Sequence, residues 1–459
     1  MKVLKFGGTS VGTVESLTNV KRIVDGLDQP AIIVVSALGG LTDRLISTAR
    51  NASRGEADIE AEMEKISGRH KEIIDTLVPA PRQPAILEKV SAHLKELGDI
   101  FKGLSLIKSL PERTLDLVVS YGERMSSIIV AEILADAEHH DSLGFMRTER
   151  WFNKDIADRG LTEKNIKEEF PLPLQRHCVL GGFISRDRDS GEITNLGRGG
   201  SDYTAALIAA ALDADSLEIW TDVDGFLTTD PRVVKNARII PTMSFVESME
   251  LCSYGAKVIY PPTIYPVFHK NIPIKILNTF NPEAPGTFIS DLPDSGMPVV
   301  RGVSVLGGTG LISIRGALAA NVAEINTRAY NVLSRNGIGV LLVGQPGDGV
   351  DFSIVVPGAD LEKGIRLIES EFSQDMKAGE VAEIKGESDM SIIAVVGESI
   401  KKIVGLGPRL ANTLWRNGIE VKCVSDGASE TTIAIVVSSG AASKALALVH
   451  ESAIERAGI

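Results

Sequence analysis

The sequence predicts an α/β fold in which a parallel-rich sheet lies between helices, followed by two small ferredoxin-like units. Residues 30–37 (PAIIVVSA) form a continuous apolar run, which is typical of a strand buried on both faces of a parallel sheet. Residues 1–27 have the pattern of a strand, a glycine turn and a helix, which is the order of an α/β unit. The segment 333–338 (LSRNGI) recurs as 414–419 (LWRNGI), and each copy lies in the order strand, helix, strand, strand, helix.

Composition limits the classes of function. The 459 residues suggest about three domains, and 44% hydrophobic with 24% charged residues is ordinary for a soluble globular protein. The net charge of −12 argues against nucleic acid or an anionic membrane as the main partner. Cys178, Cys252 and Cys423 are widely spaced, so we expect no metal site and a reducing compartment. Without a signal-peptide pattern or a membrane-length apolar run, the expected location is the cytoplasm.

Strands and helices alternate through the first part of the chain. Two charged helices between residues 58 and 109, split near 79–81, have the mixed charge pattern of solvated faces without chemistry. The other expected elements are strands at 1–6, 30–37, 177–185, 216–222 and 271–276, and helices at 14–27 and 115–135.

The stretch 195–204 (NLGRGGSDYT) is the most informative part of the sequence. Ser201 and Asp202 precede a run of helix formers, so we expect a helix to begin near Ser201. Free amides at a helix start, preceded by glycines that let a ligand approach closely, form an anion site. The planar guanidinium of Arg198 suits a carboxylate or a phosphate. A helix that is merely capped after a flexible turn is the alternative.

A second glycine turn, Gly7 and Gly8, follows the first strand. Lys5 lies at the end of that strand, where it is expected to point at whatever the turn holds. The pattern is neither a P-loop, because the lysine precedes the glycines, nor a dinucleotide fingerprint, which needs a third spaced glycine. A lysine that only shields the strand end is the alternative.

Three further polar residues occupy favourable positions. Ser36 and Thr42 follow the second strand, and ligands bind at the carboxyl ends of such strands. Isolated hydroxyls of this kind are more often plain helix caps. Glu123, beside Gly122 in the helix 115–135, could reach a ligand amine, although an exposed helical glutamate is the commoner case.

Residues 222–225 (DVDG) suggest a calcium loop at first. Val233 occupies the position of the closing glutamate, so the calcium loop is rejected. A nucleotide clamp is the other interpretation, in which carboxylates meet the ribose or base, an aromatic ring packs on the base and a guanidinium meets a phosphate. The residues in these roles would be Asp222 and Asp230, Phe226, and Arg232.

Taken in order, these segments resemble those of aspartokinases, within the amino acid kinase family. The resemblance covers essentially the whole chain and is closest to the kinase half of bifunctional aspartokinase–homoserine dehydrogenases. No dehydrogenase half is present, so the chain is expected to be either monofunctional or a fragment. The segments that carry the resemblance are 5–10 (KFGGTS), 196–203 (LGRGGSDY), 220–225 (WTDVDG) with 229–232 (TDPR), and 255–258 (GAKV).

The resemblance implies phosphoryl transfer from ATP, carrying Mg²⁺, to the β-carboxylate of L-aspartate, the first step towards lysine, threonine and methionine. Lys5 would stabilise the transferring group and Asp202 would orient Lys5, because such transfer depends on positioning and on neutralising charge. Arg198 would bind a carboxylate of aspartate and Glu123 its amine, and the attacking carboxylate needs no general base. The other implied contacts are Thr42, Gly199, Gly200 and Ser201 for aspartate, and Lys5, Gly7, Gly8, Ser36, Thr221, Asp222, Phe226, Asp230, Arg232 and Lys257 for ATP.

Two positions depart from the family pattern. A Thr-Asn pair is usual where this chain has Thr42 and Asp43, which would put a negative charge near an anionic substrate. A tyrosine is usual at Phe226, so stacking would survive here but a phenolic hydrogen bond would not.

The turn-rich segment 291–298 is expected to close a catalytic domain of residues 1–292. The repeated units, 301–380 and 388–457, resemble tandem ACT domains, which bind amino-acid effectors at their mutual interface. In this family one unit can be inserted in the other, so their boundary is soft. The resemblance also implies a homo-oligomer in which these units pair between chains.

The two repeated units are not equally good matches to the ACT pattern. The second keeps 396–398 (VGE) and 426–430 (DGASE), close to the usual signature. The first has 316–321 (GALAAN) and 344–349 (GQPGDG) at the corresponding places. Effector contacts would lie in such loops, so we predict altered or lost feedback inhibition by lysine or threonine.

Two other functions compete with this interpretation. One is a different amino acid kinase, acting on acetylglutamate, glutamate or a nucleotide, against which the segment 5–10 and the ACT-like tail argue. The other is a non-catalytic amino-acid sensor that keeps the fold. A sensor would be expected to lack Lys5, Arg198 or Asp202, and all three are present.

Overall fold

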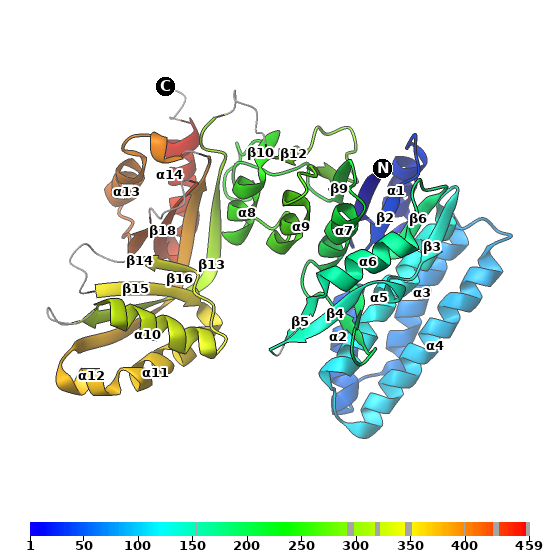
Figure 1. Cartoon of the computed structure of the whole chain (residues 1–459), viewed down its shortest axis with the longest axis horizontal. Coiled ribbons are helices and arrows are strands. Elements are labelled where there is room, and N and C mark those ends of the chain that lie inside the picture. Colours follow the sequence, from blue (N-terminus) through cyan, green and yellow to red (C-terminus); the bar gives the residue numbers. More distant parts are fainter. Residues whose placement is uncertain are drawn as a thin grey trace. The chain divides into compact units, whose positions relative to one another are not determined.

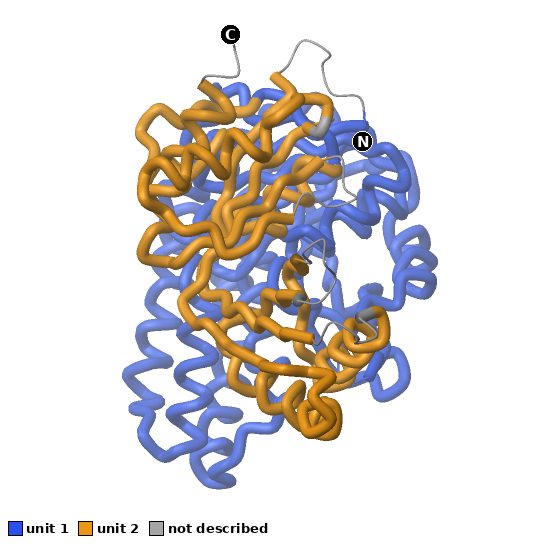
Figure 2. The backbone as a smooth tube through the Cα atoms, turned by 90° about the vertical axis from the view of Figure 1, so that its left-hand side faces the viewer, with its two compact units in different colours: residues 1–226, 241–245, 258–293 blue, residues 227–240, 246–257, 294–459 orange. Residues whose placement is uncertain are grey.

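The computed structural model describes residues 1–152, 154–291, 298–316, 322–344, 351–398, 400–425 and 431–455. The chain folds into two compact units, which Figure 2 shows in different colours. Unit 1 comprises residues 1–226, 241–245 and 258–293, and unit 2 comprises residues 227–240, 246–257 and 294–459. Of the four repeat-unit segments singled out in the sequence, 396–398 is described, whereas most of 316–321 and 344–349 and all of 426–430 lie outside the described residues, as does most of the expected linker 291–298.

Unit 1 is built on an eight-stranded sheet with the order β10-β12-β11-β9-β1-β2-β6-β3. Neighbouring strands run parallel except for β11 and β12, so the predicted parallel-rich sheet is confirmed. Every residue of β2 is buried, as its unbroken apolar run predicts. The strands are β1 (Lys2–Phe6), β2 (Ile32–Val35), β3 (Ala137–His140), β6 (His177–Gly181), β9 (Ser216–Thr221), β10 (Thr242–Ser244), β11 (Ile274–Asn278) and β12 (Thr287–Ser290).

Helices cover both faces of this sheet (Figure 1). Leu4 and Phe6 of β1 pack in one core with α1–α5. Because side chains alternate along a strand, Lys5 points to the opposite face, where α7 packs on β1. None of the described helices is long and apolar enough to cross a membrane. The helices are α1 (Val14–Asp25), α2 (Leu41–Arg54), α3 (Ile59–Leu77), α4 (Gln83–Ile107), α5 (Glu112–Ile133), α6 (Arg159–Glu169), α7 (Gly200–Ala211) and α9 (Ile264–Phe268).

A four-stranded sheet with the order β5-β4-β7-β8 leads into the glycine-rich stretch. Its last strand ends at Asn195, whose side-chain oxygen accepts a hydrogen bond from the Gly197 amide at 2.9 Å. The small sheet therefore fixes the start of the glycine loop. Its strands are β4 (Arg147–Trp151), β5 (Lys154–Ala157), β7 (Ile184–Asp187) and β8 (Ile193–Asn195).

Unit 2 contains a six-stranded antiparallel sheet with the order β14-β15-β13-β16-β18-β17. The predicted order strand, helix, strand, strand, helix is present in both copies. The elements are β13 (Gly302–Gly316), α10 (Val322–Arg335), β14 (Leu342–Gly344), β15 (Asp351–Pro357), α11 (Leu361–Glu371), α12 (Ser373–Ala378), β16 (Val381–Val396), α13 (Leu406–Arg416), β17 (Cys423–Ser425), β18 (Thr432–Ser438) and α14 (Ala442–His450), with α8 (Phe245–Ser253) before them.

The two copies share the long strand β13. Ile312 and Ile314, in its second half, pack with α10 and α11, whereas Val303 at its beginning and Val300 just before it pack in the core formed by residues 393–453. The start of β13 thus contributes to the core of the second copy.

Residues 227–240 and 246–257 are attached to the six-stranded sheet and to α14 by hydrogen bonds within unit 2. The Val303 amide donates to the Thr228 carbonyl at 2.8 Å, and Thr228 Oγ1 lies 3.0 Å from His450 Nε2. Thr432 Oγ1 donates to Glu250 Oε2 at 2.9 Å. Nothing in the sequence pattern indicated these attachments, because the partners lie far apart in the chain.

Gly397, in the predicted segment 396–398, has no room for a side chain. A Cβ there would lie 1.8 Å from the carbonyl oxygen of Val299 and 2.8 Å from its carbonyl carbon. Gly397→Ala should therefore lower the free energy of unfolding by about 2–3 kcal/mol. Gly407→Ala, in α13 with nothing within 4 Å, should raise it by about 0.5–1 kcal/mol. Urea unfolding of both variants checks this, and equal midpoints would contradict it.

Candidate active site

The carboxyl ends of β1, β2 and β6 meet at a cavity of about 320 Å³ in unit 1. Every residue predicted for catalysis or for aspartate binding lines it, together with Ser36 and two residues that were not predicted, Phe183 and Gly197. The lining residues are Lys5, Ser36, Thr42, Glu123, Phe183, Gly197, Arg198, Gly199, Gly200, Ser201 and Asp202.

Lys5 and Asp202 form an ion pair in this cavity. Their Nζ and Oδ1 atoms lie 2.6 Å apart, and the two side chains are 11% and 12% exposed. The helix that carries Asp202 begins at Gly200, with Gly199 as its N-cap in the left-handed region at φ 68°. The helix thus begins within one residue of the predicted start at Ser201, although its N-cap is Gly199, in a left-handed turn, and not Ser201 or Asp202. The Asp202 carboxylate is left to pair with Lys5.

Two glycines of the site admit no side chain. A Cβ on Gly199 would lie 2.2 Å from Cβ of Tyr260, and one on Gly182 would lie 2.6 Å from Cα of Ser201. The glycine pair at the end of β6 thus lets the first turn of α7 approach the sheet closely. This close packing brings Ser201 and Asp202 to the strand ends.

Two of the four glycine amides predicted to line the ATP phosphates and the attacking carboxylate donate within the protein. Those of Gly7 and Gly200 donate to the carbonyls of Trp220 at 3.2 Å and Gly197 at 3.0 Å. Within the described chain no carbonyl accepts from the amides of Gly8 or Gly199. Anion binding by the backbone therefore depends on these two and on first-turn amides of α7, which have no acceptor inside the helix.

Glu123 is not the exposed helical glutamate that its position suggests as the commoner case. Its side chain lines the cavity and the residue is only 4% exposed. Oε1 accepts the Ala37 amide at 3.1 Å, and no atom of the described chain donates to Oε2. Burial raises the pKa of Glu123 to about 8, and the Ala37 hydrogen bond and the Lys5 charge oppose that rise. A buried carboxyl group with one unpartnered oxygen suits a ligand cation.

Arg198 and Asp43 differ in their relation to the cavity. Arg198 lines it, is exposed and forms no ion pair with any described residue. Asp43 is exposed in the first turn of α2 and lines a separate cavity beside Arg44, whereas Thr42 lines the site. Successive helical residues point about 100° apart, so the expected negative charge at Asp43 does not face the substrate cavity.

Two positioning contacts escaped the sequence analysis. Arg69 of α3 donates from Nη2 to the carbonyl oxygens of Gly12 and Gly39 at 3.1 and 3.0 Å, which ties the turn after β1 to the turn after β2. Ser126 Oγ donates to the Ser36 carbonyl at 2.7 Å. The helices between residues 58 and 109 are therefore not merely solvated faces, and the charge pattern could not single out Arg69.

Among the predicted ATP contacts of unit 1, the aromatic ring of Phe226 is buried. Thr221 and the exposed Asp222 lie at the end of β9, with their side chains 3.3 Å apart. Phe226 is 1% exposed, and its amide donates to Thr287 Oγ1 at 2.8 Å. The expectation that the Phe226 ring stacks on a base does not agree with this burial.

The other predicted ATP contacts, Asp230, Arg232 and Lys257, belong to unit 2. Arg232 is exposed and pairs with Asp230, with Nη2 2.7 Å from Oδ2, and this partner lowers the pKa of Asp230. Lys257 is exposed. The predicted nucleotide contacts are thus divided between the two units.

A larger cavity of about 930 Å³ lies in unit 1 and shares only Gly197 with the first. Its charged lining is mainly acidic, so it repels phosphate and carboxylate ligands. The smaller cavity, with Lys5 and Arg198, is the better candidate for anionic substrates. The acidic residues of the larger one are Glu112, Asp116, Glu149, Asp155 and Asp158.

Comparison with known proteins identifies the family of the chain. A profile described as the amino acid kinase family matches residues 1–278, and an ACT domain profile matches residues 393–452. The bifunctional aspartokinase/homoserine dehydrogenase of Buchnera aphidicola is 30% identical over 98% of this chain and 56% of the relative. Chloroplastic aspartokinase 1 of Arabidopsis thaliana is 28% identical over 99% of this chain and 80% of the relative. The chain spans about half the length of the bifunctional relatives it matches.

A solved structure also resembles the whole chain. E. coli aspartokinase III in complex with aspartate and ADP matches with a TM-score of 0.84 and 26% identity, over 98% of this chain and 99% of that one. The match to the family profile covers more than half of the residues, including both glycine turns and the Lys5–Asp202 pair. The chain belongs to the amino acid kinase family.

Proposed function

We propose that this protein transfers the γ-phosphoryl group of ATP to the β-carboxylate of L-aspartate, giving 4-phospho-L-aspartate, the precursor of lysine, threonine and methionine. The observation that carries the proposal is the cavity in which the Lys5–Asp202 pair lies with Arg198 and the buried Glu123. These groups offer positive charge for phosphate and carboxylate, and a carboxyl group for an amine. The likeness to an aspartokinase solved with aspartate and ADP supports the same substrates.

The reaction requires charge neutralisation rather than a base. A β-carboxylate oxygen bonds to the γ-phosphorus as the bond to the bridging oxygen of ADP breaks. The Lys5 ammonium offsets the charge on the transferring oxygens, and Asp202 keeps it oriented. Mg²⁺ carried by the ATP phosphates would neutralise further charge on the transferring group.

Aspartate recognition follows from the free groups of the cavity. The unpaired Arg198 binds a carboxylate in a bidentate fashion. Glu123 Oε2 accepts from the ammonium group, and the hydroxyls of Thr42 and Ser201 complete the polar lining.

ATP-dependent acyl-phosphate formation, trapped with hydroxylamine, tests this function across a set of acceptors. L-aspartate should be the substrate, and L-glutamate and N-acetylglutamate should give no more than background. A preference for either of these acceptors would keep the fold and overturn the substrate. Inactivity with every acceptor, in folded protein that still binds ATP or an amino acid, would favour the sensor.

The buried Glu123 weakens the alternative of an N-acetylated acceptor. An acetylated nitrogen carries no positive charge, so such an acceptor would offer no cationic partner to the ionised form of Glu123. The sensor alternative leaves the pairing of Lys5 with Asp202 unexplained.

Asp43→Asn tests whether Asp43, which departs from the family pattern, faces the substrate. Since Asp43 does not line the cavity, we expect its KM for aspartate to stay within about twofold of the wild type. Thr42→Val, which removes a hydroxyl from the cavity, should raise KM about tenfold. Steady-state kinetics decide, and a larger effect at Asp43 than at Thr42 would contradict the placement.

We further propose that residues 301–380 and 388–457 act as regulatory ACT-like domains of a catalytic domain formed by residues 1–292, and that two copies of the chain associate through them. The ACT profile at 393–452 supports this. Thr228, close to Asp230 and Arg232 in the sequence, is hydrogen-bonded to Val303 of β13 and to His450 of α14. An effector bound to the ACT-like domains can therefore act on the segment 229–232, which is predicted to contact the nucleotide.

Feedback inhibition is predicted to be altered or lost. E. coli aspartokinase III has also been solved with lysine and aspartate in a T-state, so lysine is the first effector to compare. Titration of kinase activity with lysine, threonine and both together should give at most weak inhibition. Half-inhibition by either amino acid at micromolar concentration would refute the prediction.

A further inference from the structure

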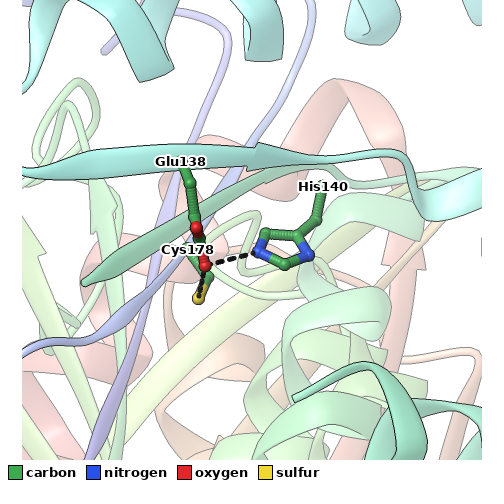
Figure 3. Close-up of side chains that lie close together, drawn as sticks. All are labelled: Glu138, His140 and Cys178. Carbon is green, nitrogen blue, oxygen red and sulfur yellow. Dashed lines mark hydrogen bonds and ion pairs between the residues drawn. The ribbon is translucent and has the colours of Figure 1, made fainter. Parts of the chain in front are cut away.

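Three side chains outside the proposed active site gather at the edge of the eight-stranded sheet (Figure 3). Glu138 of the edge strand β3 lies directly opposite Cys178 of β6 in the parallel register. His140 follows two residues later, so its side chain shares the face of Glu138. His139 points to the other face, where Nε2 lies 3.0 Å from Ser127 Oγ. The proposed function uses none of the three.

Their donor atoms are spaced for a metal ion. His140 Nε2 lies 3.2 Å and Cys178 Sγ lies 3.9 Å from Glu138 Oε1, and all three donor atoms lie within 4.8 Å of one another. Four ligands placed tetrahedrally around Zn²⁺ stand about 3.3–3.8 Å apart, since its bonds are about 2.0–2.3 Å long. Small side-chain movements would close the site.

The second nitrogen of His140 is held independently. Nδ1 lies 2.6 Å from Oε1 of Glu169, the last residue of α6, and the ring of Phe170 lies 4.9 Å from the imidazole ring. An Nδ1–H that donates to Glu169 directs the lone pair of Nε2 at Glu138 and Cys178. Metal-binding histidines commonly have such a carboxylate behind them, because it fixes their tautomer and orientation.

We propose that Glu138, His140 and Cys178 bind one Zn²⁺ ion through Oε1, Nε2 and Sγ, with water in the fourth position. A thiolate, an imidazole and a carboxylate form a donor set of intermediate softness, which suits Zn²⁺ better than Mg²⁺ or Ca²⁺. The ion displaces the Cys178 thiol proton, and any proton on Nε2, to solvent. Glu138 is exposed while Cys178 is buried, so the ion would enter past Glu138. Bound there, it cross-links β3 to β6.

Cobalt provides the direct test, because Co²⁺ occupies zinc sites and a thiolate ligand gives it a near-ultraviolet charge-transfer band. The full chain, stripped with a chelator, should take up one equivalent of Co²⁺ with this band. Cys178→Ser should abolish the band, and Cys252→Ser and Cys423→Ser should keep it. Equal bands in Cys178→Ser and the wild type, or no band with excess Co²⁺, would overturn the proposal.

Zinc affinity and thermal stability give independent readouts. Zn²⁺ should raise the Tm of the wild type but not that of His140→Gln, since an ion that binds only the folded state stabilises it. Glu169→Gln should retain the cobalt band and bind Zn²⁺ about 10–100-fold more weakly. Circular dichroism establishes that each variant folds. If His140→Gln folds and its Tm rises with Zn²⁺ as much as that of the wild type, the assigned ligand set is wrong.

Discussion

Lys5→Ala is expected to lower kcat for aspartate phosphorylation by at least about a thousandfold, or roughly 4 kcal/mol of transition-state stabilisation. The ammonium group of Lys5 lies in a cavity with little exposure to water, so its attraction for phosphate oxygens is strong. Removing it also leaves the Asp202 carboxylate unpaired beside an anionic substrate. Initial rates at saturating ATP and aspartate measure the loss.

Matched variants separate the charge of Lys5 from general damage. Lys21→Ala removes an exposed lysine of α1 that pairs with Asp25, and it should leave kcat unchanged within about twofold. Asp202→Asn keeps the shape of the side chain but removes the charge that orients Lys5, so we expect a loss of about 10–100-fold. If folded Lys5→Ala protein keeps more than a tenth of the wild-type kcat, Lys5 does not have the proposed role.

Glu123→Gln is expected to raise KM for aspartate about 100-fold with a much smaller change in kcat. The variant loses a charge-assisted hydrogen bond in a buried site, worth about 1.5–3 kcal/mol. Glu132→Gln, on the same helix α5, removes a surface carboxylate 3.6 Å from Arg82 and serves as the control. An equal change in KM for the two variants would exclude Glu123 from amine recognition.

The pH dependence of aspartate binding follows from the same residue. Because burial raises the pKa of Glu123 to about 8, the free protein holds this group neutral at lower pH. The substrate ammonium needs the ionised form, so KM should rise as pH falls below 8, by up to about tenfold per pH unit. KM of the Glu123→Gln variant should change little in this range, and a KM of the wild type that is constant between pH 6 and 8 would contradict the assignment.

The raised pKa of Glu123 also determines how this residue changes the free energy of unfolding with pH. A carboxyl group whose pKa is raised on folding binds more protons in the folded state, so it costs stability progressively as pH rises from its unfolded pKa to about 8. Glu123→Gln should therefore be at least as stable as the wild type at pH 9. Urea unfolding of both proteins at pH 9 checks this, and a variant that is clearly less stable than the wild type would contradict it.

The main elements of the site could be predicted from the sequence, because residues close to each other in the chain determine them. The apolar run at β2, the glycine turn after Lys5 and the glycines before α7 each determine backbone structure within a few residues. The pairing of Lys5 with Asp202 came from the family resemblance. The structure has these two side chains in contact, at 2.6 Å.

Other features depend on contacts between distant segments, which one sequence does not specify. Helical position alone could not show that Glu123 is buried, since its burial depends on the close approach of β6. A Cβ added to Gly181 would lie only 3.0 Å from the Cβ of Glu123. Phe226 is covered although the motif suggested an open ring. The spacing of the cysteines indicated no metal site, because the ligands proposed here come from neighbouring strands, with Glu138 and Cys178 40 residues apart.

The identity of the phosphorylated product tests the central claim most directly. Protein incubated with ATP, Mg²⁺ and L-aspartate in the presence of hydroxylamine should yield β-aspartyl hydroxamate and an equal amount of ADP, both identified by mass spectrometry against standards. The Lys5→Ala variant should give neither above background. Formation of the α-hydroxamate, or release of ADP without any hydroxamate, would contradict the proposed transfer to the β-carboxylate.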